Sequence, residues 1–266
     1  MIDFHIHTDI SPDAEQALGD VVERARTLGI SHLAITDHYE FLENDFYKGW
    51  TIKDLVAYAR SIEKHNNKYD DIYIATGIEV GHINRMIDKI KNVLDSVDFD
   101  FIISSTHFIN EVDPYFPEYY KGKPKEETYY SYLKEIRDSI DVMDDRVSVI
   151  GHIGYAARYS PYEDNKLKYE DFSDIIDELL IKIIKRGFGI ELNTSNYGRK
   201  LDEIMPPISI IKRYRQLGGE IITIGSDAHK LKDIGKEYSK ARQIALNAGF
   251  KYVSVFKNLE SEFITL

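Results

Sequence analysis

Histidine and acidic residues recur in this sequence in short motifs, each placed at or just after a short apolar run. Six of the nine histidines have this placement: His5, His7, His38, His107, His152 and His229. The acidic residues Asp37, Glu79 and Asp227 occupy equivalent positions. Imidazole and carboxylate groups without thiolates are typical ligands of Zn, Mn or Fe, and the set is larger than one tetrahedral ion needs. The residues therefore predict two or three divalent metal ions.

The spacing within the motifs has a physical reason. Side chains alternate along a strand, so both histidines of the segment HIH at 5–7 point to the same face and can reach one ion. Asp227 and His229 are expected to repeat this arrangement if strand geometry continues that far. A lone HxH motif or a single buried histidine is more often structural, whereas the combination of strand-end histidines and acids favours a metal site.

The elements that must position these residues follow from hydrophobic periodicity. Seven β-branched and aliphatic runs predict strands at 2–6, 32–36, 72–80, 101–106, 147–153, 189–193 and 221–226. Amphipathic segments between them predict helices at 19–28, 52–68, 85–96, 126–142, 172–186, 208–217 and 238–248. This alternation is typical of an α/β fold with a parallel barrel, whose active site lies at the carboxyl ends of the strands. The run 252–256 is expected to add a short strand that closes the chain.

Composition narrows the class of protein further. The chain has 266 residues, 43% of them hydrophobic, and 34 basic against 45 acidic residues give a net charge of −11. These values predict one folded domain over residues 1–266 and disfavour non-specific binding to nucleic acid or anionic membranes. The absence of cysteine excludes disulfides and thiolate chemistry. The N-terminus lacks the pattern of a signal peptide and no run of 18 apolar residues is present, so we expect a cytoplasmic protein without membrane association.

Six motifs together resemble the PHP (polymerase and histidinol phosphatase) superfamily over nearly the whole chain: HIHTDISPD at 5–13, TDH at 36–38, GIEV at 77–80, STH at 105–107, GH at 151–152 and GSDAH at 225–229. The resemblance implies a single distorted (β/α)7 TIM-like barrel with a trinuclear metal centre at the carboxyl ends of the strands. It also implies three ligand sets, with Glu79 shared between the first two: His5, His7, Glu79 and Asp227; Glu79, His107 and His152; and Asp13, His38 and His229. Some family members have histidine in place of Asp13. Asp37 is expected to orient a ligating histidine.

Within the superfamily, four segments resemble the histidinol-phosphate phosphatases: STHFINEVDPY at 105–115, GHIGYAARY at 151–159, IELNTSNYGRK at 190–200 and GSDAHKLKDIG at 225–235. This implies metal-dependent hydrolysis of L-histidinol phosphate in histidine biosynthesis. Glu79 and Asp227 would be catalytic through a hydroxide generated at the metals. Arg158 and Arg199 would bind the substrate phosphate, because a guanidinium can grip phosphate oxygens in bidentate fashion. For either arginine alone, a surface salt bridge is an equal alternative.

The aromatic insert at 108–125 is the expected source of the remaining pocket. Its residues Glu111, Asp113, Tyr115 and Phe116 offer acids and rings for the amine and imidazole of the substrate, although such a loop can simply pack on its own barrel. Two other functions stay open: a PHP phosphoesterase for nucleotides or nucleic acid ends, and a catalytically silent metal-stabilised module. A phosphoesterase for nucleic acid would need a row of basic residues or an added nucleic-acid-binding module, and a silent module could lack some of the metal ligands. The sequence shows none of these features.

Overall fold

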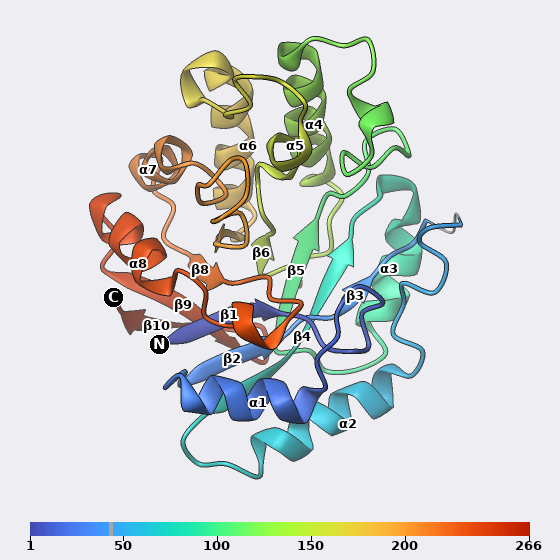
Figure 1. Cartoon of the computed structure of the whole chain (residues 1–266), viewed down its shortest axis with the longest axis vertical. Coiled ribbons are helices and arrows are strands. Elements are labelled where there is room, and N and C mark those ends of the chain that lie inside the picture. Colours follow the sequence, from blue (N-terminus) through green and yellow to red (C-terminus); the bar gives the residue numbers. More distant parts are fainter. Residues whose placement is uncertain (43–44) are drawn as a thin grey trace.

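Seven parallel strands follow one another around a barrel in the computed structural model, which describes residues 1–42 and 45–266 (Figure 1). Their order is β1-β2-β4-β5-β6-β7-β8. The strands are β1 Ile2–Ile6, β2 His32–Ile35, β4 Tyr73–Gly81, β5 Phe101–Ser105, β6 Val149–Ile150, β7 Gly189–Asn193 and β8 Ile222–Gly225. Nearly every residue in them is buried, as expected for parallel strands that are covered on both faces.

The barrel is nearly closed between β8 and β1. The two strands share no full ladder, but Ile6 forms a parallel bridge with Ala228 just beyond β8. The amide of Asp227 donates to the carbonyl of His5 at 2.8 Å, and the amide of His7 donates to the carbonyl of Ala228 at 3.1 Å. The predicted distorted seven-stranded barrel is thus confirmed. These bonds also bring the first and last strand-end motifs of the chain together.

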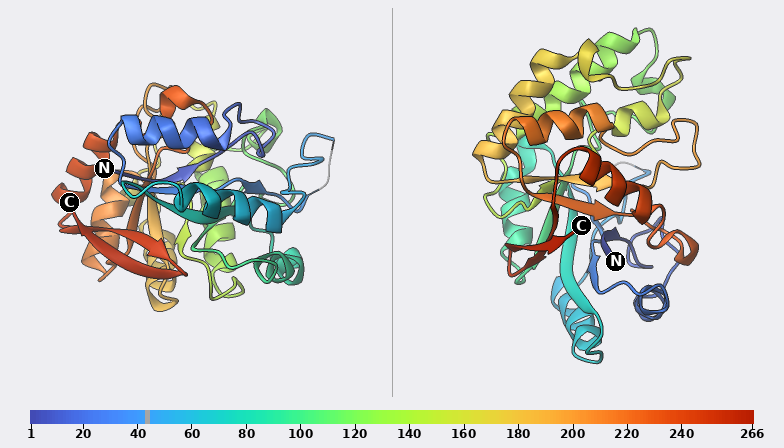
Figure 2. Two further views of the ribbon diagram at one scale, coloured as in Figure 1. Left: turned by 90° about the horizontal axis from the view of Figure 1, so that it is seen from below. Right: turned by 90° about the vertical axis from the view of Figure 1, so that its left-hand side faces the viewer.

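Helices cover the outside of the barrel. Helices α4 and α6 lie side by side at the top of Figure 1, and α1 lies beside α2 at the bottom (Figures 1 and 2). Each of the longer helices buries one apolar stripe; in α6 it includes Ile176, Leu180 and Ile183. The helices are α1 Leu18–Thr27, α2 Leu55–Asn66, α3 Ile87–Leu94, α4 Lys125–Ser139, α5 Tyr155–Tyr159, α6 Ser173–Lys185, α7 Ile208–Gln216 and α8 Tyr238–Asn247. In the described part of the chain, no helix combines the length and the apolar character needed to span a membrane.

The structure differs from the sequence predictions at several element boundaries. Helix α2 begins at Leu55 rather than at 52, because the Asp54 side chain accepts a hydrogen bond from the amide of Ala57 at 2.9 Å and caps the helix there. The strand predicted at 147–153 is reduced to the two residues of β6. The strand expected at 252–256 is present as β9, Tyr252–Lys257, but it is not the last element: it pairs with β10, Glu260–Thr265, in an antiparallel hairpin separate from the barrel sheet.

A two-residue strand, β3 (His38–Tyr39), matters for the site although periodicity did not predict it. It lies parallel to the second half of β4 and places His38 opposite Glu79 and Tyr39 opposite Val80. The first half of β4 pairs with β2 and the second half also pairs with β5. Strand β4 therefore carries Glu79 to the centre of the rim, between the segments that supply His38 and His107.

Candidate metal centre

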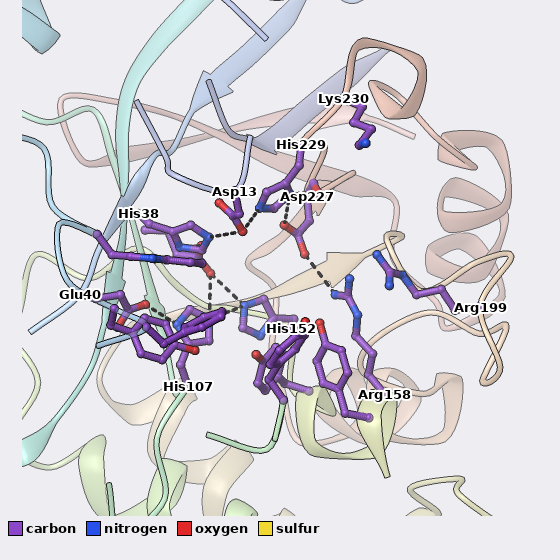
Figure 3. Close-up of a pocket in the computed structure, with 17 residues that line it drawn as sticks. Asp13, His38, Glu40, His107, His152, Arg158, Arg199, Asp227, His229 and Lys230 are labelled. Atoms are coloured by element: carbon purple, nitrogen blue, oxygen red, sulfur yellow. Dashed lines mark hydrogen bonds and ion pairs between the residues drawn. The ribbon is translucent and has the colours of Figure 1, made fainter. Parts of the chain in front are cut away.

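The carboxyl ends of the barrel strands bring all nine predicted metal ligands to one rim. Figure 3 labels those of them at Asp13, His38, His107, His152, Asp227 and His229. Seven of the nine are buried: His5, His7, His38, Glu79, His107, His152 and, by its side chain, Asp227. Asp13 comes from the loop after β1 and His229 from the loop after β8, and both are partly exposed. The expectation that strand-end histidines and acids converge is confirmed in its geometry.

The two histidines of β1 point to the same side, as the period of a strand requires. The Nε2 atoms of His5 and His7 are 3.1 Å apart. Asp227 Oδ1 lies 3.8 Å from His5 Nε2 and 3.4 Å from His7 Nε2, and Glu79 Oε2 lies 3.3 and 3.5 Å from the same two atoms. Two nitrogens and two carboxylate oxygens thus surround a single point.

Glu79 lies between two such groups. Its Oε1 is 2.8 Å from His152 Nε2 and 3.6 Å from His107 Nε2. Its Oε2 faces the β1 histidines and is 2.9 Å from His38 Nδ1. Because each oxygen faces a different set of imidazoles, this one carboxylate has the position of a bridge between two metal ions.

Asp13, His38 and His229 form a third group at the mouth of the rim. Asp13 Oδ2 is 3.0 Å from His229 Nε2 and 3.7 Å from His38 Nε2. The Asp13 carboxylate thus lies within ion-pair distance of both histidines. The expected strand geometry from Asp227 to His229 is wrong: β8 ends at Gly225, and Asp227 has a φ of 53°, in the left-handed region. The turn nevertheless keeps His229 Nδ1 3.5 Å from Asp227 Oδ1.

The electrostatics of this cluster suit metal binding. Burial raises the pKa of the Glu79 carboxyl, but the charges of His5 and His38, together with side-chain contacts such as that with His152, hold the pKa well below its ordinary value. Burial, with the nearby His229 and His38, lowers the pKa of His7 to about 3, so its Nε2 is available as an electron-pair donor at neutral pH. Glu79 Oε2 and His38 Nδ1 are buried and lie 2.9 Å apart as an ion pair, but neither atom makes a hydrogen bond of good geometry. A bound cation would satisfy both of these buried atoms.

Several three-residue groups within residues 1–42 and 45–266 place ligand atoms within 4.8 Å of one another. They are His5, His7 and Asp227; Glu79, His107 and His152; His7, His38 and His229; and His38, Glu40 and His107. The residues therefore fit a cluster of metal ions better than a single ion.

Four polar residues that support the cluster were not identified from the sequence. Glu191 accepts hydrogen bonds from His5 Nδ1 at 2.6 Å and from the amide of His152 at 2.7 Å. Glu40 Oε1 lies 2.6 Å from His107 Nδ1. Asn193 and Ser195 both contact Asp227 Oδ2, at 3.4 and 3.1 Å. The available signal was the alternation of Glu191 and Asn193 in an otherwise apolar strand.

Asp37 reaches a ligating histidine only through another residue. Its carboxylate accepts hydrogen bonds from the amide and hydroxyl of Thr8, at 2.7 and 2.8 Å, and from the Ser11 hydroxyl at 2.7 Å. The Ser11 oxygen is in turn 3.2 Å from His7 Nδ1. Asp37 therefore holds the loop after β1 in place and acts on the orientation of His7 through Ser11.

A cavity of about 360 Å³ opens over the cluster, and the two predicted arginines lie on its side nearest Asp227 (Figure 3). Arg158 is buried in its side chain, and its Nη1 donates to the Ser195 hydroxyl at 3.0 Å and lies 3.5 Å from Asp227 Oδ2. Arg199 is exposed and donates from Nε to the Ser195 carbonyl at 3.2 Å. Both arginines are thus anchored on Ser195, and Arg158 is not a surface salt bridge.

The rest of the cavity wall is mostly aromatic. The rings come from three segments of the chain: Phe46, Tyr47, Trp50, Tyr115, Tyr155 and Tyr159. Of the residues expected from the insert, Tyr115 lines the cavity, Phe116 packs on Phe46, and buried Asp113 accepts a hydrogen bond from Tyr47. Glu111 does not reach the cavity, because its exposed side chain pairs with Arg85. The segment around Trp50 was not expected to contribute.

Comparisons with known proteins agree with this geometry. Residues 3–195 match the PHP domain family. The chain is 32% identical to a probable histidinol-phosphatase of Clostridium acetobutylicum over 97% of this chain and 98% of that protein. It is 30% identical to the histidinol-phosphatase of Lactococcus lactis over 97% and 95% of the two chains. A crystal structure of the Lactococcus lactis histidinol phosphate phosphatase complexed with Zn, L-histidinol and phosphate superposes with a TM-score of 0.89, 29% identity and 98% coverage of both chains. The chain belongs to the PHP domain family, within its histidinol-phosphatase branch.

Proposed function

We propose that this protein hydrolyses L-histidinol phosphate to L-histidinol and inorganic phosphate. The full-length similarity to histidinol-phosphatases supports this substrate, as does the fold shared with a relative that holds L-histidinol and phosphate. The single observation that carries the proposal is the position of Arg158. Its buried guanidinium borders the metal-ligand cluster at Asp227 and faces the cavity, where it can bind a phosphate placed against that cluster.

Three groups of residues would hold the metal ions. His5, His7, Glu79 and Asp227 would form the first site, Glu79 with His107 and His152 the second, and Asp13 with His38 and His229 the third. Zn is the metal in the related solved structure, and Fe and Mn suit the same nitrogen and oxygen donors. Bound ions of this kind lower the pKa of water toward 7 and polarise phosphoryl oxygens.

Different side chains of the cavity would bind different parts of the substrate. Arg158 and Arg199 would bind the non-bridging phosphate oxygens and stabilise the charge that develops during phosphoryl transfer. In the reaction, the oxygen of water bonds to phosphorus, the bond from phosphorus to the alcohol oxygen breaks, and the alcohol oxygen takes up a proton. The aromatic wall near Trp50 and Tyr115 would hold the imidazole end of the substrate, since flat rings stack favourably.

The direct test is product analysis with metal-loaded protein. The protein is incubated with L-histidinol phosphate in the presence of Zn, Mn or Fe, and phosphate and L-histidinol are measured separately. We expect equal amounts of both products and a loss of turnover in Arg158→Ala. Arg213→Ala is the matched control, because Arg213 pairs with Asp177 on the outer helices and should leave turnover unchanged. Failure to release phosphate in any metal would refute the proposal.

A further inference from the structure

Glu40 and Gly81 form a close pair at the carboxyl-end rim of the barrel, and Glu40 lies across the cavity from Arg158 (Figure 3). Gly81 is the last residue of β4, and Glu40 follows the short strand β3 that pairs with β4. The Glu40 side chain is fully buried and lines the cavity. A side chain added at Gly81 would start 1.8 Å from Glu40 Oε2, 2.4 Å from Cδ and 2.7 Å from Oε1. The carboxylate therefore occupies the space that any other residue at position 81 would need.

The backbone gives no other reason for a glycine at this position. The glycines with positive φ in the described chain include Gly29, Gly154 and Gly235 but not Gly81, which lies in regular strand conformation. An L-residue could adopt that conformation without strain. The three heavy atoms nearest to the missing Cβ all belong to Glu40. Gly81 is thus required by its neighbour and not by its own backbone.

The Glu40 carboxylate also contacts His107, one of the predicted metal ligands. Glu40 Oε1 lies 2.6 Å from His107 Nδ1, while the opposite ring nitrogen, Nε2, faces His152 Nε2 at 3.3 Å and Glu79 Oε1 at 3.6 Å. A carboxylate on Nδ1 keeps the proton there, leaves Nε2 free to bind a metal, and fixes the plane of the ring.

A related arrangement occurs on the other side of the cluster, where a glutamate and the histidine that it holds both lie against a glycine. A Cβ on Gly225, at the end of β8, would lie 2.4 Å from the Cβ of His5 and 2.6 Å from Glu191 Oε1, and Glu191 holds Nδ1 of His5. Gly225 also lacks a positive φ. Two buried glutamates thus each hold one histidine of the cluster and each lie against a strand-end glycine.

We propose that Glu40 is a positioning residue that sets the tautomer and orientation of His107 for metal binding, and that Gly81 is a glycine because it must leave room for this carboxylate. The proposal rests on the ligand role of His107 in the proposed function. The proposal is tested by metal binding as well as by activity, so it and the proposed function can fail separately. Loss of the Glu40 contact is expected to weaken metal binding by about 10- to 100-fold at the site that contains His107.

The experiment is a double-mutant cycle on the full chain with Glu40→Ala, Gly81→Ala and the double variant. Metal affinity is measured by competition with a chelator, the visible spectrum of the Co-loaded protein is recorded, and kcat and KM are determined with L-histidinol phosphate. We expect each single variant to weaken one metal site and alter the Co spectrum. In the Glu40→Ala background, Gly81→Ala should add less than about a twofold further loss, because the atoms that it would displace are gone.

Two further variants separate positioning from simple loss of stability. Glu40→Gln keeps an oxygen that can accept from His107 Nδ1, so it should retain more metal affinity than Glu40→Ala. Gly77→Ala lies on the same strand, but its Cβ would start 2.7 Å from the backbone oxygen of Ile35, so Glu40→Ala should not relieve its effect. Additive losses in the Glu40 and Gly81 cycle would overturn the proposal. A lower melting temperature in Glu40→Ala with wild-type metal affinity and Co spectrum would overturn it as well.

Discussion

His5 Nδ1 and Glu191 Oε1 are 2.6 Å apart in a fully buried pair on the inner side of the metal-ligand cluster. The carboxylate directs the proton of the imidazole to Nδ1 and turns Nε2 toward His7 and Asp227. The other oxygen of Glu191 accepts from the amide of His152, so the same residue also anchors the loop of a second ligand.

Glu191→Ala should therefore weaken metal binding and activity together, by about 10- to 100-fold. Glutamine at this position should cost less, since an amide oxygen still accepts one of the two hydrogen bonds. Bound metal is measured by elemental analysis after dialysis, alongside kcat/KM. The exposed Glu63 of α2 offers a control, and Glu63→Gln should behave like the wild type. Full metal content and activity in Glu191→Ala would show that His5 needs no support.

Glu79 should act on two metal sites at once, because its two oxygens face different groups of histidines. Protein purified without chelator is expected to contain more than one equivalent of transition metal. Glu79→Gln should lower the content by more than one equivalent, since the amide cannot replace a bridging carboxylate. Elemental analysis of both proteins checks this. A variant that loses only a single ion would argue against the bridge.

Arg158 and Arg199 should differ in the size of their effects. Arg158 is buried beside Asp227, and replacing it with alanine removes a charge-assisted contact worth about 1.5–3 kcal/mol, which lowers kcat/KM by roughly 10- to 150-fold. Arg199 is exposed, so its replacement with alanine should lower kcat/KM by about tenfold, at the low end of that range. Lysine restores the charge but not the planar fork, and should rescue only in part. Steady-state kinetics with unchanged metal content test this pair. Wild-type kcat/KM in both alanine variants would remove the arginines from the site.

Strand-end positions were predictable from the sequence because the period of two and the apolar runs fix where each motif leaves the barrel. His5, His7, Glu79 and His152 meet as expected for that reason. The contributions of Glu40 and Glu191 were not predictable, since a glutamate in a short segment gives no sign of which histidine will face it. Segments as short as β3 and α5 leave no periodicity to detect. The turn at Asp227 depends on tertiary contacts with β1 rather than on local sequence.

Removal of metal should destabilise the fold, because the ligand side chains come from the first, last and central strands. A ligand at 100 times its Kd contributes about 2.7 kcal/mol to the free energy of unfolding. For a chain of this size, that amount corresponds to a melting temperature roughly 5–10 °C lower for each emptied site. Thermal unfolding followed by circular dichroism, with and without chelator, measures the difference. Restored Zn should recover the original transition, whereas an unchanged transition after complete metal removal would contradict a structural contribution of the ions.

The central claim is that the cavity selects L-histidinol phosphate, and the most direct measurement is kcat/KM for this substrate against nucleoside monophosphates and short nucleic acids with 3′- or 5′-phosphate ends. All substrates are compared at the same metal loading, because discrimination between them reflects differential binding of the transition states. We predict that L-histidinol phosphate has the highest value, since the two arginines and the aromatic wall line one small cavity over the metal-ligand cluster. A higher kcat/KM for nucleotides or nucleic acid ends would contradict the account and indicate a nucleotide-directed phosphoesterase of the same family.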